Sequence, residues 1–107
     1  MFVRALELTL KVEKKADLIK RAKNDIVPML NKQRGFTDIL ALEGQVELNK
    51  AIILTFWHTA LDAERYEREM FPTIKQILDP YLLTHPITKV FTVEEVISEK
   101  FTHTRAA

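Results

Sequence analysis

Several residue types that often carry chemistry are scarce in this 107-residue chain. It has no cysteine, which excludes disulfides, thiolate catalysis and sulfur-ligated metals and is compatible with the cytoplasm that we expect. Its two glycines, Gly35 and Gly44, are too few for a phosphate-binding glycine-rich loop. The single serine, Ser98, lies in no nucleophile-elbow motif, and the three histidines have no metal-ligand spacing. We therefore expect neither a metal site nor a cofactor.

An excess of charge of one sign and long apolar runs are also missing. Sixteen Lys and Arg face fifteen Asp and Glu, so the net charge of +1 gives no electrostatic footprint for nucleic acid or an anionic membrane. The apolar runs are far shorter than the ~18 residues that span a bilayer. Arg4 and Glu7 interrupt the first eleven residues, so we expect no signal peptide. The 47% hydrophobic and 29% charged content fits one globular domain.

Hydrophobic periodicity in the first half of the chain predicts a strand, a helix and a second strand. Leucines alternate with polar residues over 2–12, which is typical of a strand. Apolar residues then recur at helical spacing over about 15–33, where Pro28 should kink or break the helix. Gly35 suits the C-terminal cap of this helix. Residues 36–43 predict the second strand, which a polar hairpin loop follows.

The second half repeats this order. Residues 51–58 are the most apolar stretch and predict a strand. Thr59 precedes Asp62 by three residues, which resembles a capping box with Asp in place of the usual Glu. A helical pattern then covers about 60–82, and Pro72 should split it by serving as the first residue of the later half.

A last strand over 87–97 completes the order β-α-β-β-α-β. This order predicts an α+β, ferredoxin-like fold, in which two helices cover one face of a four-stranded antiparallel sheet. Residues 1–97 should form the single domain, and 98–107 a C-terminal tail.

The predicted third strand is apolar on both faces. Ile52 and Leu54 point one way, while Ile53 and Trp57 point the other. The uncovered face of such a sheet normally alternates toward polar residues. We therefore expect a second copy of the chain to cover it, giving a homodimer joined through the sheets. A hydrophobic small molecule is the other partner we expect.

The chain resembles antibiotic biosynthesis monooxygenase-like proteins. The residues that carry this resemblance are Gly35 and Phe36, which open the second strand, and Trp57, which ends the third just before a helix start. The segment 66–72, Tyr-Glu-Arg-Glu-Met-Phe-Pro, and the segment 78–82, Leu-Asp-Pro-Tyr-Leu, are similar to a pattern in uncharacterised members.

The resemblance covers about residues 2–97 and implies a dimeric α+β barrel. Members of this group differ in chemistry, which includes cofactor-free oxidation of polyketide-derived aromatics, haem degradation and lactone isomerisation, so the fold does not transfer a function. Haem-degrading relatives use an Asn in the first strand, where this chain has Leu6 and Glu7. Their histidine ligand would fall near Gln76 or Ile77, so the iron ligand is not matched.

Relatives that oxidise aromatic compounds use Asn, Trp and Tyr side chains to hold the substrate and stabilise developing negative charge. Trp57 and Tyr66 match two of these parts, and no Asn matches the third. His58 or Glu7 is the candidate base, and the Tyr66 hydroxyl could donate to a substrate oxyanion. Glu7 could instead pair with Lys or Arg across the dimer, and Arg4 is expected at the rim of the sheet.

The candidate substrate-binding residues are Trp57, Phe56 and Met70, which would wall an aromatic-binding pocket. Each candidate has a purely structural alternative, because large apolar residues at these spacings also build cores. The leading hypothesis is cofactor-free oxygenation of a hydrophobic aromatic or phenolic molecule. The alternatives are a non-catalytic ligand-binding or assembly protein on the same scaffold, and an isomerase of a small lactone.

Overall fold

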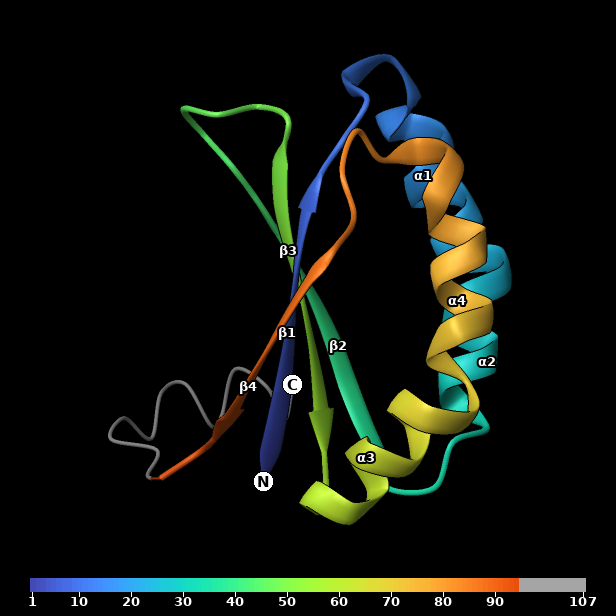
Figure 1. Ribbon diagram of the computed structural model, residues 1–107, viewed down its shortest axis with the longest axis vertical. Coiled ribbons are helices and arrows are strands. Elements are labelled where there is room, and N and C mark those ends of the chain that lie inside the picture. Colours follow the sequence, from blue (N-terminus) through green and yellow to red (C-terminus); the bar gives the residue numbers. More distant parts are fainter. Residues whose placement is uncertain (95–107) are drawn as a thin grey trace.

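The computed structural model describes residues 1–94 and contains one antiparallel sheet with helices on a single face (Figure 1). The strand order across the sheet is β2-β3-β1-β4. The strands are β1 (Phe2–Thr9), β2 (Phe36–Glu43), β3 (Lys50–Trp57) and β4 (Ile87–Thr92). This arrangement confirms the predicted ferredoxin-like fold. The end of the predicted last strand and the tail 98–107 lie outside the described residues.

The first helical segment is interrupted close to Pro28, as the sequence predicts. It comprises the 3-10 turn η1 (Val12–Lys14), α1 (Lys15–Arg21), the π-helical turn η2 (Ala22–Ile26) and α2 (Val27–Asn31). Pro28 has no N–H to donate and its ring crowds the carbonyl four residues earlier, so the backbone widens into a π turn just before it.

Gly35 is needed at the turn before β2 and not at the end of the helix, which corrects its expected capping role. α2 is capped at Lys32, whereas Gly35 has a φ of 80°, in the left-handed region. A Cβ atom at this position would also lie 2.1 Å from the Asp62 carboxylate, so the turn packs closely on the start of α3 (Ala60–Glu69).

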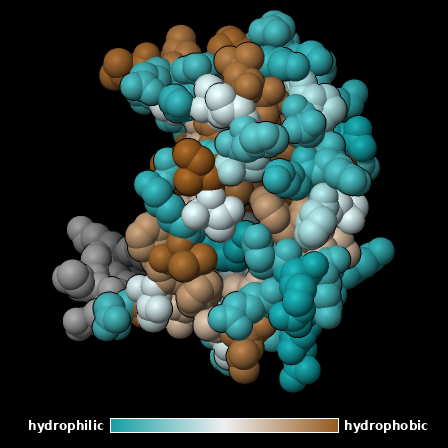
Figure 2. Space-filling view, viewed as in Figure 1, coloured by the Kyte–Doolittle hydropathy of each residue, from teal (hydrophilic) through white to brown (hydrophobic). Residues whose placement is uncertain are grey.

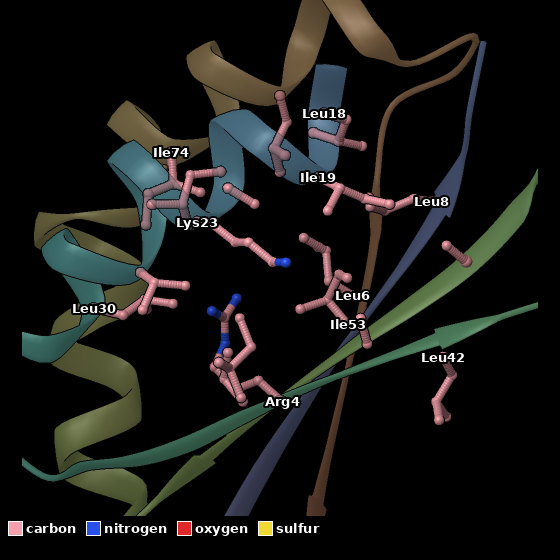
Figure 3. Close-up of a pocket in the computed structure, with 18 of the residues that line it drawn as sticks. Arg4, Leu6, Leu8, Leu18, Ile19, Lys23, Leu30, Leu42, Ile53 and Ile74 are labelled. Atoms are coloured by element: carbon pink, nitrogen blue, oxygen red, sulfur yellow. The ribbon is translucent and has the colours of Figure 1, made fainter. Parts of the chain in front are cut away.

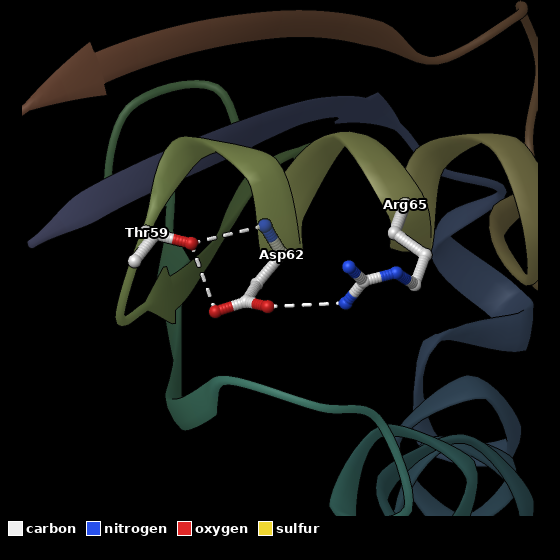
Figure 4. Close-up of polar contacts among 3 residues, drawn as sticks. All are labelled: Thr59, Asp62 and Arg65. Atoms are coloured by element: carbon white, nitrogen blue, oxygen red, sulfur yellow. Dashed lines mark hydrogen bonds and ion pairs between the residues drawn. The ribbon is translucent and has the colours of Figure 1, made fainter.

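The second helical segment starts and divides as the sequence predicts. The Thr59 hydroxyl oxygen accepts a 3.1 Å hydrogen bond from the Asp62 amide and donates a 2.9 Å bond to its carboxylate, which Arg65 contacts at 3.1 Å (Figure 4). The hydrogen bond from Thr59 lowers the pKa of Asp62 below its ordinary value, against the effect of burial. Pro72 is the second residue of α4 (Phe71–Leu78), one position later than predicted, and the 3-10 turn η3 (Asp79–Tyr81) follows this helix.

Both faces of the sheet carry apolar side chains, but helices cover only one. Leu8 and the fully buried Trp57 belong to the core between sheet and helices. Strand register places Leu40, Ile52 and Phe91 on the other face, where they are 41%, 36% and 54% exposed. Figure 2 shows hydrophobic residues at the surface on the sheet side of the molecule. Within residues 1–94, every helix is too short or too polar to cross a membrane.

Candidate functional site

A cavity of about 400 Å³ lies between the helices and the inner face of the sheet (Figure 3). Its walls are mostly aliphatic and come from all four strands and both helical segments. Representative lining residues are Leu6, Leu18, Leu30, Ile39, Ile53 and Ile74. A volume of this size is typical of sites for small molecules, and few polar groups interrupt the walls. The arrangement therefore suits a hydrophobic ligand that makes a small number of directed polar contacts.

Arg4 supplies one of these polar groups from the middle of β1. Its side chain is 6% exposed and forms an ion pair with Glu67 of α3, which is itself half-exposed. The guanidinium carbon lies 5.0 Å from the centre of the Tyr66 ring and 4.9 Å from that of Phe71, so both rings contribute cation–π attraction. These contacts hold a positive charge at the wall of an apolar cavity.

Tyr66 lines the same end of the cavity from α3. Burial raises its pKa to about 12, and the charge of Arg4 and a hydrogen bond from it act in the opposite direction. The phenol is therefore neutral at neutral pH and can donate its proton in a hydrogen bond. Arg4 and Tyr66 thus place a cationic and a neutral hydrogen-bond donor side by side. Two such donors can stabilise an oxyanion.

Trp57 supports Tyr66 from behind the cavity wall. The two ring centroids are 4.7 Å apart, and Phe36 contacts the indole edge-on at 5.5 Å. The indole N–H donates a 2.9 Å hydrogen bond to the hydroxyl of Thr55, which also lines the cavity. Trp57 itself does not line the cavity and packs against Tyr66 from the core.

The remaining sequence candidates lie away from the cavity. His58 is exposed just after β3, and Met70 is half-buried against the core between α3 and α4. Phe56 and Glu7 belong to the opposite face of the sheet, where Glu7 pairs with Lys89 of the same chain at 2.8 Å. Of the six predicted site residues, Tyr66 alone lines the cavity, so the structure does not bring either candidate base to it.

Arg4 is the residue that the sequence reasoning misplaced. It was expected at the rim of the sheet and is instead buried, because Glu67 and two aromatic rings compensate for the loss of water around its charge. The available signal was its alternation with Leu6 and Leu8, since a charge within a buried stripe needs a partner. That partner, Glu67, is 63 residues away along the chain, so the local sequence gives no hint of it.

No family model matches the chain, and no curated protein matches its sequence. Solved structures do match its fold. SnoaB, a cofactor-independent oxygenase from Streptomyces nogalater, is 14% identical with a TM-score of 0.71, over 92% of this chain and 97% of SnoaB. The monooxygenase ActVA-Orf6 from Streptomyces coelicolor, solved with nanaomycin D, is 14% identical with a TM-score of 0.74, over 91% and 90% of the two chains.

A Deinococcus radiodurans protein, provisionally named an antibiotic biosynthesis monooxygenase, is 16% identical with a TM-score of 0.74. The match covers 92% of this chain and 97% of that protein. Identities this low establish a shared architecture and no shared chemistry. The resemblance read from the sequence is therefore confirmed as a fold: this chain has the ferredoxin-like α+β architecture of antibiotic biosynthesis monooxygenase structures.

Proposed function

We propose that this protein is a cofactor-independent oxygenase of a hydrophobic molecule that ionises to a phenolate or enolate. The observation that carries the proposal is the pairing of cationic Arg4 with neutral Tyr66 at one end of an otherwise apolar cavity. In surroundings of low dielectric, these two donors would stabilise the ligand's anion far more than they would in water.

The reaction starts with loss of a proton from an acidic C–H or phenol. The adjacent Arg4 charge lowers the pKa of the bound substrate, and the proton leaves to water because His58 and Glu7 do not line the cavity. The electron-rich anion gives one electron to O2, and the resulting substrate radical and superoxide combine into a peroxide anion, which takes up a proton from water to form a hydroperoxide. At a CH2 carbon, loss of water then leaves a ketone, so that one O2 is consumed and one water is formed for each CH2 oxidised.

The solved structures support this reading only by analogy. SnoaB is described as a cofactor-independent oxygenase, and ActVA-Orf6 is a monooxygenase seen with a ligand. Both share the present fold at 14% identity. The proposed location is the cytoplasm, with which a chain free of cysteine is compatible.

The test uses anthrone, whose CH2 is acidic because its conjugate base is an aromatic phenolate. The wild-type protein should accelerate both O2 uptake and anthraquinone formation above the rate in buffer. Tyr66→Phe should lower kcat/KM at least about tenfold, since a hydrogen bond to an anion is worth about 1.5–3 kcal/mol and about 1.4 kcal/mol is tenfold in rate. A wild-type rate equal to the buffer rate would reject the oxygenase proposal.

The second candidate function is non-catalytic binding of a hydrophobic molecule. The mainly aliphatic lining favours it, because such walls retain a ligand without acting on it. Saturable binding of anthrone with no acceleration of O2 uptake would select this function.

We further propose that a second copy of the chain covers the outer face of the sheet. Large apolar side chains are exposed there, including Leu40, Ile87 and Phe91, and an exposed face of this kind is unusual in a protein that stays monomeric. A two-fold axis would bring the same residues of both copies together.

Native mass spectrometry should give about 25 kDa, twice the 12.5 kDa of one chain. Leu40→Lys should shift the species toward the monomer, because it places a charge in the proposed interface. Leu61→Lys is the matched control, since Leu61 is 71% exposed on α3, and this variant should stay dimeric. A wild-type mass near one chain would rule out the dimer.

A further inference from the structure

We propose that the ligand of the cavity also carries a carboxylate, which forms an ion pair with Lys23. The inference rests on the proposed function, in that it takes the cavity as the binding site. It adds the substrate class: a hydrophobic acid with a second ionisable oxygen.

Lys23 reaches the cavity from the π-helical turn η2. Figure 3 shows its side chain crossing from the helix toward the sheet, with the ammonium nitrogen turned into the space that Arg4 enters from the opposite wall. Lys23 is an exposed residue beside the buried stripe of the helix, so its alkyl stem can cover apolar wall while water that enters the cavity hydrates its ammonium. The ammonium is thus within reach of a ligand in the cavity.

The other cations that line the cavity already have partners in the chain. Arg4 pairs with Glu67, and Lys15 pairs with Glu43. Among the residues that the structure describes, no carboxylate lies within ion-pairing distance of Lys23. The neighbouring helix charge Arg21 is likewise paired, with Asp25. Lys23 therefore faces the cavity with its charge available.

An unpaired cation beside apolar walls selects a particular kind of ligand. A neutral hydrocarbon filling the cavity would strip water from the ammonium without replacing its contacts, which costs free energy. A carboxylate would restore those contacts as charge-assisted hydrogen bonds. Arg4 and Tyr66 already receive the phenolate or enolate oxygen, so Lys23 is positioned for a separate anionic group.

The experiment compares hydroxynaphthoic acid with its methyl ester, which keeps the phenol and the ring system and lacks the carboxylate. Binding is measured by titration of the naphthyl fluorescence at neutral pH. Wild-type protein should bind the acid five- to tenfold more tightly than the ester, and added salt should reduce the difference. Lys23→Gln should abolish this preference and leave the affinity for the ester within about twofold.

Lys20→Gln is the matched control, because Lys20 is exposed on α1 in the same helical segment, does not line the cavity and gives the same change in net charge. It should retain the preference for the acid. Equal binding of acid and ester by the wild type, or equal effects of the two substitutions, would overturn the carboxylate assignment and leave the phenol site standing. Failure of both compounds to bind would overturn the proposed binding site as well.

Discussion

Replacing Arg4 with methionine should lower kcat/KM for anthrone oxidation by about 100-fold or more. The guanidinium is the only cation held beside Tyr66 and Phe71 at that end of the cavity among the described residues, and removal of one oxyanion donor typically costs 10²–10³-fold in rate. The measurement is O2 uptake with anthrone, using protein whose fold is verified by circular dichroism. A folded Arg4→Met protein with the wild-type rate would remove Arg4 from the proposed mechanism.

The variant should fold because its environment accepts an apolar side chain. Methionine is shorter than arginine, but it is unbranched, flexible and apolar, so it can pack on the rings of Tyr66 and Phe71. The orphaned partner, Glu67, is half-exposed and can be hydrated by water. Replacement of a buried ion pair's cation is costly mainly when the remaining charge stays buried, which is not the case here.

A second readout separates loss of charge stabilisation from a change in shape. The phenol of bound methyl hydroxynaphthoate should ionise at a lower pH than in water, because the Arg4 charge favours the phenolate. In Arg4→Met the pKa of this bound phenol should rise above its value in water, since the apolar walls then act alone. Glu67→Gln is the control: it keeps Arg4 and removes a competing anion, so the pKa should fall or stay unchanged.

Features that depend on local chemistry could be read from the sequence. The predicted bounds of β2 coincide with Phe36–Glu43, because a glycine turn adjoins each end of that strand. Pro28 and Pro72 divide their helical segments as expected, since a missing N–H acts within one turn. The form of the first interruption was not predictable, because an alpha-helical kink and a π turn both accommodate a proline.

The site was less accessible than the fold because its polar groups come together only in three dimensions. Tyr66 was proposed from the resemblance to relatives that oxidise aromatic compounds, and it lines the cavity. Glu7 belongs to the opposite parity from Leu6 and Leu8, and so it lies outside the cavity. Lys23 carries no sequence signal apart from its position four residues after Ile19, on the side of the helix that borders the cavity.

Replacing Trp57 with alanine should lower the free energy of unfolding by about 3–5 kcal/mol, the usual cost of deleting a large aromatic side chain from a core. Trp57 is 0% exposed and contacts Phe36 and Tyr66 through its ring. A domain of this size is stable by about 5–15 kcal/mol, so the variant should be close to unfolding. Urea denaturation at one fixed protein concentration measures the change, because dissociation of the proposed dimer would otherwise contribute.

Trp57→Phe distinguishes the packing role of the indole from its hydrogen bond. Phenylalanine keeps a ring against Tyr66 and loses the 2.9 Å bond to Thr55, so the expected cost is about 1–2 kcal/mol. If Trp57 orients Tyr66, the affinity for methyl hydroxynaphthoate should be retained in Trp57→Phe and should fall in Trp57→Ala. The comparison is made at a temperature at which both variants are folded. Equal affinities in the two folded variants would show that Tyr66 holds its position without the indole. Trp57 would then contribute only to the stability of the fold.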